Sequence, residues 1–180
     1  MNMEADWEFE IGGGAPLIEA YWGGFVDLRA RPGRVSEIKE CHDLPGLADV
    51  LLKLNGVGSP VWTSKTDVFL AERVDPDEMN ANDDETKAAI ACYLDLLPRM
   101  RDSWSDAPRA EEFCRQICGR LAAQPLRCCR IDIVVRRTIF EEAAELGTTV
   151  YATACGALLA DAKQQLAKCL AILATALVGH

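Results

Sequence analysis

The sequence predicts an α+β protein of the ferredoxin-like type (βαββαβ), in which helices cover one face of an antiparallel sheet. Strand-like stretches alternate with amphipathic helices along the chain, in a globular composition of 49% hydrophobic and 26% charged residues. Residues 18–71 and 87–137 also match internally, since each reads as strand, helix and strand. We therefore expect a single domain over residues 1–180 that contains an internal duplication.

The first unit is preceded by an alternating stretch, residues 6–11, which predicts a strand. Three glycines follow, and we expect them to turn the chain into a second strand over residues 18–28, forming a hairpin. The 3–4 spacing of leucine and valine over residues 47–54 predicts a helix, and residues 60–71 predict a strand. Residues 72–86 are acidic and rich in turn formers, which predicts an exposed loop.

The second unit begins with residues 87–98, whose composition is typical of a helix. The internal match nevertheless assigns a strand there, because Tyr93–Leu96 falls on Phe25–Leu28 at an offset of 68 residues. A helix near 108–123 and a strong strand, RCCRIDIVVRR, complete the unit. Residues 147–178 then add a short strand and a long helix.

The same match bears on the cysteines. Cys114 and Cys118 occupy the positions of Leu47 and Leu51, which favours buried side chains over metal ligands. The sequence contains eight cysteines and two histidines, so thiol redox chemistry remains a third hypothesis for function.

Charge and hydropathy limit the classes of partner. The net charge of −9 argues against binding to nucleic acids and to anionic membranes, which both require basic surfaces. The chain has no run of about 18 apolar residues and no signal-peptide pattern at its N-terminus. We therefore expect a cytoplasmic location, in which the cysteines are reduced.

One face of the predicted sheet carries polar side chains. Strand alternation places Trp62 and Ile131 toward the helices and a second set of residues on the opposite, open face. An aspartate falls at an equivalent place on each of four predicted strands. The predicted binding face consists of Asp27, Lys65, Asp67, Tyr93, Asp95, Arg130, Asp132 and Arg136.

Three interpretations of this face stay open. In the first, the face is a salt-bridged surface, either solvated or buried in a dimer. In the second, Asp27 and Asp95 lie on neighbouring strands and hold Mg²⁺ or Mn²⁺. Alternatively it binds a small anionic ligand through its basic side chains, with walls from Phe25, Phe69 and Tyr93. The broad apolar stripe of the last helix additionally predicts a homodimer.

The leading functional hypothesis is a non-catalytic module that binds a ligand or a protein through the open face. The alternative is a divalent-metal-dependent enzyme for phosphoryl or nucleotidyl chemistry that uses the strand aspartates. No pattern in the sequence identifies a substrate or a catalytic residue.

Overall fold

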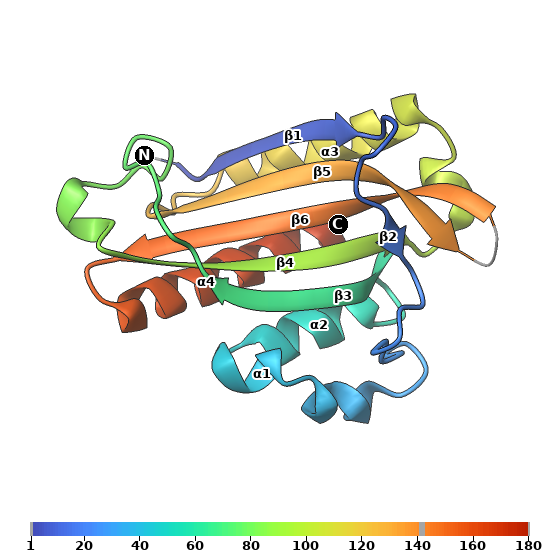
Figure 1. Ribbon diagram of the computed structural model, residues 1–180, viewed down its shortest axis with the longest axis horizontal. Coiled ribbons are helices and arrows are strands. Elements are labelled where there is room, and N and C mark those ends of the chain that lie inside the picture. The colour runs from blue at the N-terminus through green and yellow to red at the C-terminus, as the bar shows by residue number, and fades with distance from the viewer. Residues whose placement is uncertain (1, 141–142, 180) are drawn as a thin grey trace.

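The computed structural model describes residues 2–140 and 143–179 and shows a mixed α+β fold with one six-stranded sheet (Figure 1). Short 3-10 helices at Pro32–Glu37, Asp83–Glu85 and Arg101–Trp104 lie in the connections. The other elements are β1 (Glu4–Glu10), β2 (Ile18–Glu19), α1 (Glu40–Asp43), α2 (Leu47–Asn55), β3 (Val61–Leu70), β4 (Ala88–Pro98), α3 (Ala107–Ala122), β5 (Cys129–Phe140), β6 (Ala143–Gly156) and α4 (Leu159–Val178).

The strand order is β1-β5-β6-β4-β3, and the short β2 also pairs with β5. Strands β1 and β2 run parallel to β5, whereas β5–β6, β6–β4 and β4–β3 are antiparallel pairs. Strands β4 and β5 are therefore parallel, with β6 between them and α3 in the connection. This is a split βαβ arrangement, and it confirms the prediction of a strand at residues 87–98.

The first predicted unit differs from the structure. Residues 18–28 were expected to form a strand, but only Ile18–Glu19 pairs in the sheet. Gly23 and Gly24 follow directly, and glycine disfavours an extended strand. The predicted N-terminal hairpin is also wrong, because β1 and β2 both lie along β5. The sheet therefore confirms a mixed α+β fold with helices on one face, but not the duplication or the ferredoxin-like strand order.

Helices α2, α3 and α4 cover one face of the sheet, behind the strands in the view of Figure 1. Buried side chains of the three inner strands, such as Leu94, Ile131 and Val150, pack against them. Helix α4 contacts β6, β4, α2 and α3, so its broad apolar stripe is filled within the chain. The apolar stripe of α4 therefore needs no second subunit to cover it, and the homodimer stays a prediction.

Cysteines occupy this core as the sequence predicted. Cys114 and Cys118 of α3 are buried among apolar residues. Burial raises the pKa of the Cys114 thiol to about 12 and that of Cys118 to about 11. Both therefore remain protonated at neutral pH, and a protonated thiol is a poor nucleophile.

An irregularity in β3 reverses the facing of its first residues. Between Thr63 and Thr66 the register with β4 shifts, so that two residues of β3 oppose one of β4. Trp62, predicted to face the helices, instead pairs with Leu97 in a cluster of its own with Ile18 and Ala20. The prediction was wrong because it assumed that side chains alternate between the two faces without interruption along β3.

None of the described helices is both long and apolar enough to cross a bilayer.

Candidate functional site

Two segments cross the open face of the sheet, one near each end (Figure 1). The first strap, residues 11–31, follows β1 and includes β2. The second strap, residues 71–87, connects β3 to β4 and is the loop that the sequence predicted as exposed. Between the straps the sheet is left uncovered, and we call this part of the face the trough.

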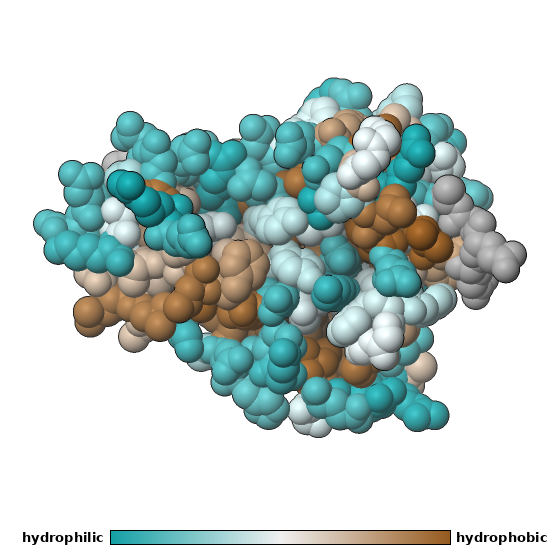
Figure 2. All heavy atoms as spheres, in the orientation of Figure 1, coloured by the Kyte–Doolittle hydropathy of each residue, from teal (hydrophilic) through white to brown (hydrophobic). Residues whose placement is uncertain are grey.

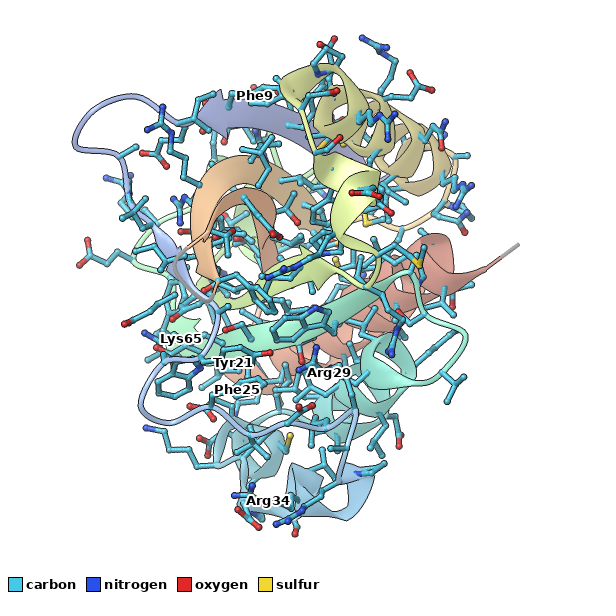
Figure 3. All side chains as sticks on the ribbon, turned by 90° about the vertical axis from the view of Figure 1, so that its right-hand side faces the viewer. Phe9, Tyr21, Phe25, Arg29, Arg34 and Lys65 are labelled. Carbon is cyan, nitrogen blue, oxygen red and sulfur yellow. The ribbon has the colours of Figure 1, made fainter. Side chains whose placement is uncertain are left out.

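Aromatic side chains hold the first strap. Tyr21 and Phe25 of the strap pack against Trp62 and Phe140 of the sheet, with ring centroids 5.2–5.9 Å apart. The Arg29 guanidinium lies 3.8 Å from the Trp62 ring centroid. Figure 3 shows Tyr21, Phe25 and Arg29 gathered beside the edge of the sheet. This end of the face is therefore closed by apolar contacts.

Ile18 of the first strap lies close against Gly147 of β6. A Cβ atom built there would lie 2.5 Å from Thr138 Oγ1 and 3.1 Å from Ile18 Cδ1. A side chain at this position would therefore collide with its neighbours, and glycine allows β2 to lie against the sheet.

The second strap is held mainly by polar contacts. Arg127 Nε donates to the Asn80 carbonyl at 3.0 Å, and Arg127 Nη2 contacts Glu85 Oε2 at 2.9 Å. Asn80 Nδ2 donates to Glu4 Oε1 at 2.9 Å. Met79, only 2% exposed, is the apolar side chain that the strap inserts beside Cys128.

A row of four side chains crosses the trough. Asp67, Tyr93, Tyr151 and Asp132 are successive cross-strand partners on β3, β4, β6 and β5. The two tyrosine rings have centroids 6.0 Å apart. The row thus places an aromatic pair at the centre of the sheet and a carboxylate on either side of it.

A hydrogen-bonded network lies beside this row. Thr149 Oγ1 donates to Asp95 Oδ1 at 2.6 Å and accepts from Arg136 Nη1 at 3.2 Å. Arg136 also donates to the Tyr151 hydroxyl at 3.2 Å and pairs with Glu10 at 2.7 Å. The network links three inner strands to β1 and fixes these polar groups on a rigid surface.

Burial and partners change the acidity of two groups here. Burial raises the pKa of Asp95, while the Thr149 hydrogen bond and the charges of Arg136 and Lys65 oppose the rise. A hydrogen bond with the Tyr93 hydroxyl raises the pKa of Lys65, whose Nζ lies 5.9 Å from the Tyr93 ring centroid. Lys65 is therefore a stable cation at the edge of the trough.

A hollow lies where the trough meets the second strap, with a volume of ≈ 430 Å³. Its sheet side is formed by Phe69, Tyr151, Arg130 and Asp132, and its strap side includes Glu78 and Met79. Arg130 pairs with Asp132 at 2.7 Å and with Glu78 of the strap at 3.5 Å. The hollow therefore combines aromatic walls with charges of both signs.

Seven of the eight predicted face residues lie on the open face. The cross-strand partners place Asp67, Tyr93, Asp95, Arg130, Asp132 and Arg136 there together, and Lys65 of the bulge reaches the same face beside the Tyr93 ring. Asp27 is the exception, because it lies in the first strap outside every strand. Arg29 donates to both of its carboxylate oxygens at 2.9 Å, which lowers the pKa of Asp27.

The predicted metal pair therefore lacks its geometric premise, since Asp27 and Asp95 are not on neighbouring strands. Within residues 2–140 and 143–179, no group of three or more His, Cys, Asp or Glu side chains is placed to hold a metal ion.

The sequence reasoning missed the contribution of β6. Thr149, Tyr151 and Thr153 alternate with the buried residues Val150, Ala152 and Ala154. This alternation is visible in the sequence and would have placed Tyr151 on the open face. Glu10, the partner of Arg136, gives no such signal, because the parallel pairing of β1 with β5 is not a local pattern.

The sequence matches no protein-family model, and searches of curated proteins and of solved structures return no significant match.

Figure 2 shows the middle of the open face in hydrophilic and intermediate colours, with hydrophobic areas toward the lower left and the right.

Proposed function

We propose that the protein is a ligand-binding module whose trough takes a small molecule of mixed charge in the hollow below the second strap. The observation that carries this proposal is the hollow itself, which lies between rigid strands and a strap held largely by polar contacts. A volume of ≈ 430 Å³ falls in the range of small-molecule sites, about 300–1,000 Å³.

The charges favour a ligand that carries both signs. Two arginines of the sheet face already have carboxylate partners, since Arg130 pairs with Asp132 and Arg136 with Glu10. A simple anion would have to compete with these carboxylates, and a simple cation with the arginines. A zwitterion supplies a counter-charge to both members of the Arg130–Asp132 pair.

The walls favour an apolar or aromatic group next to those charges. Phe69 is 41% exposed and faces the hollow with Tyr151. Burying an aromatic group against such walls is favourable, and stacking adds about 0.5–1.5 kcal/mol. Amino acids with aromatic side chains and short peptides that contain them have this chemistry.

The proposal is one of binding without a reaction. Asp95, the acid of the trough whose pKa is raised, is held by Thr149 and does not line the hollow. A general acid or base must reach the reacting atom, at about 2.6–3.2 Å.

The test is thermal unfolding with four probes: L-phenylalanine, the dipeptide Phe-Gly, spermidine and inorganic phosphate. We expect the two zwitterions to raise the melting temperature, because at a concentration of about 100 Kd a ligand adds about 2.7 kcal/mol of stability. Asp132→Asn and Arg130→Gln should each abolish the response, and Asp49→Asn on the exposed side of α2 should preserve it.

A response to phosphate alone would replace this proposal with the anion site expected from the sequence. If the zwitterions still bind the Asp132→Asn variant, their binding site lies outside the hollow. If no probe changes the melting temperature, the proposal is refuted.

A further inference from the structure

Strand β3 has a free outer edge over Thr66–Leu70. The Ala71 N–H donates to the Ala89 carbonyl at 3.1 Å, which fixes which residues of β3 bond to β4. Because antiparallel pairs alternate, Asp67 and Phe69 bond inward, while Thr66, Val68 and Leu70 turn their N–H and C=O groups outward. Outward groups of this kind are a template for another strand.

The two ends of β3 differ in this respect. Nearer its start, Thr63 N–H donates to Asn55 Oδ1 at 3.1 Å, and the Ser64 carbonyl accepts from Trp22 Nε1 at 3.2 Å. These side chains occupy the edge up to the bulge. From Thr66 to Leu70, no other segment among the described residues forms a main-chain hydrogen bond with this edge, although α1 packs against β3.

The opposite edge of the sheet is protected by charge. Strand β1 carries a carboxylate at every second position, namely Glu4, Asp6, Glu8 and Glu10. Strand β3 instead ends in Phe69 and Leu70, which are 41% and 66% exposed. Charged edges prevent strand pairing and apolar edges permit it, so β3 is the edge suited to a partner.

A pocket opens beside the outward groups of Thr66. It has a volume of ≈ 160 Å³ and lies between β3, the first strap and the segment that leads into α1. Its apolar walls come from Trp22, Val26, Ile38 and Leu51. A cavity of about 150 Å³ holds one benzene-sized group, so this pocket has room for one apolar side chain.

Alternation of side chains connects the pocket to the edge. In an added strand, residues opposite Thr66 and Leu70 point toward the helix side, and the residue opposite Asp67 points toward the open face. The first of these positions faces the pocket. The second meets Leu70 and Leu159, which line a shared hollow of ≈ 230 Å³ and are 66% and 39% exposed.

Asp67 determines the charge of the partner. Its Oδ1 accepts the outward Val68 N–H at 2.9 Å, so the carboxylate covers one donor of the free edge. A carbonyl of an added strand would take over this N–H and release the carboxylate. The released charge then pairs with a cationic side chain at the position opposite Asp67, beside Phe69. The net charge of −9 also favours a basic partner.

We infer that the edge of β3 binds an extended basic peptide of a partner protein, which adds a strand to the sheet over Thr66–Leu70. Read in the direction of β3, the pattern it recognises is apolar–basic–x–x–apolar, with the first apolar residue in the pocket at Trp22 and the second on Leu70 and Leu159; a peptide that pairs antiparallel carries the same pattern in reverse order. Main-chain hydrogen bonds supply affinity, and the pocket and Asp67 supply specificity. This surface is additional to the ligand site in the hollow.

The experiment uses a phage-displayed library of random dodecapeptides, selected on the full-length protein. We expect enrichment of sequences with the pattern above, and binding of one synthetic selected peptide measured by calorimetry. Val68→Pro removes an outward N–H without affecting the pairs with β4, and it should weaken binding about tenfold, the equivalent of about 1.4 kcal/mol. Val68→Thr retains the N–H and should bind like the wild type. Asp67→Asn should reduce the affinity and its dependence on salt.

Three results would overturn the inference. They are a selection without binders, selected peptides that bind Val68→Pro as tightly as the wild type, and a concentration-dependent dimer that Val68→Pro dissociates. The last would assign the edge to a second copy of the chain. Asp132→Asn should leave peptide binding unchanged, so a failure here is distinguishable from a failure of the proposed function.

Discussion

The two straps cover the same sheet face by different means. The first strap is held by aromatic rings and by Arg29 over Trp62, and the second by Arg127, Asn80 and a single buried methionine. Apolar contacts of this kind are insensitive to salt, whereas partly exposed ion pairs weaken as ionic strength rises. We infer that the first strap is a permanent part of the core and that the second opens more readily. The hollow lies below the second.

The largest expected effect lies at the first strap. Trp62→Ala removes the ring at the centre of the aromatic cluster, and truncating a buried tryptophan costs roughly 3–5 kcal/mol of unfolding free energy. Chemical denaturation measures this loss, with Trp62→Phe as the conservative control. A loss below about 1 kcal/mol would show that this strap is no more tightly held than the other.

A smaller effect is expected at the second strap. Arg127→Ala removes the contacts to Asn80 and Glu85, at a cost of about 1 kcal/mol because both charged side chains are partly exposed. Hydrogen exchange should accelerate at Cys128, whose N–H donates to the Met79 carbonyl, and remain unchanged at Ala20. Arg115→Ala, on the exposed face of α3, is the matched control. Equal acceleration at both straps would contradict the difference between them.

The smallest effect concerns the uncovered part between the straps. Because burial raises the pKa of Asp95, the folded state binds more protons than the unfolded state just above pH 3.8. Its contribution to stability is present at lower pH and is lost as the pH rises through the raised pKa. Asp95→Asn should remove this part of the pH dependence, whereas Asp49→Asn should retain it. Parallel stability curves for wild type and Asp95→Asn would show that Asp95 is not desolvated.

Much of the fold follows from local patterns in the sequence. The helices over 47–54 and 108–123 and the polar strand face were predicted from periodicity, which reflects which side of an element is buried. The strand at 88–98 is instructive, because its composition favours a helix. The internal match gave the right element there, although the sheet does not confirm the duplication on which the prediction relied.

The errors come from features that periodicity does not encode. The bulge at Ser64 and Lys65 changes the facing of Trp62, because one additional residue shifts the alternation. Asp27 was placed on a strand that the glycines after Trp22 interrupt. The first strap, and with it the boundary of the trough, depends on contacts between residues far apart in sequence.

The pairing of β1 and β2 with β5 has a consequence for how the chain folds. Glu4 lies opposite Arg130 and Ile18 opposite Thr138, so the first strands have no partner in the sheet until the chain beyond residue 129 is available. During synthesis the N-terminal segment has no strand partner until most of the protein is made, whereas β3–β4 and β5–β6 pair strands that are adjacent in sequence. Such distant pairings slow folding, because the loop must close before any contact compensates for the lost entropy. The N-terminus is therefore the last part of the sheet to assemble.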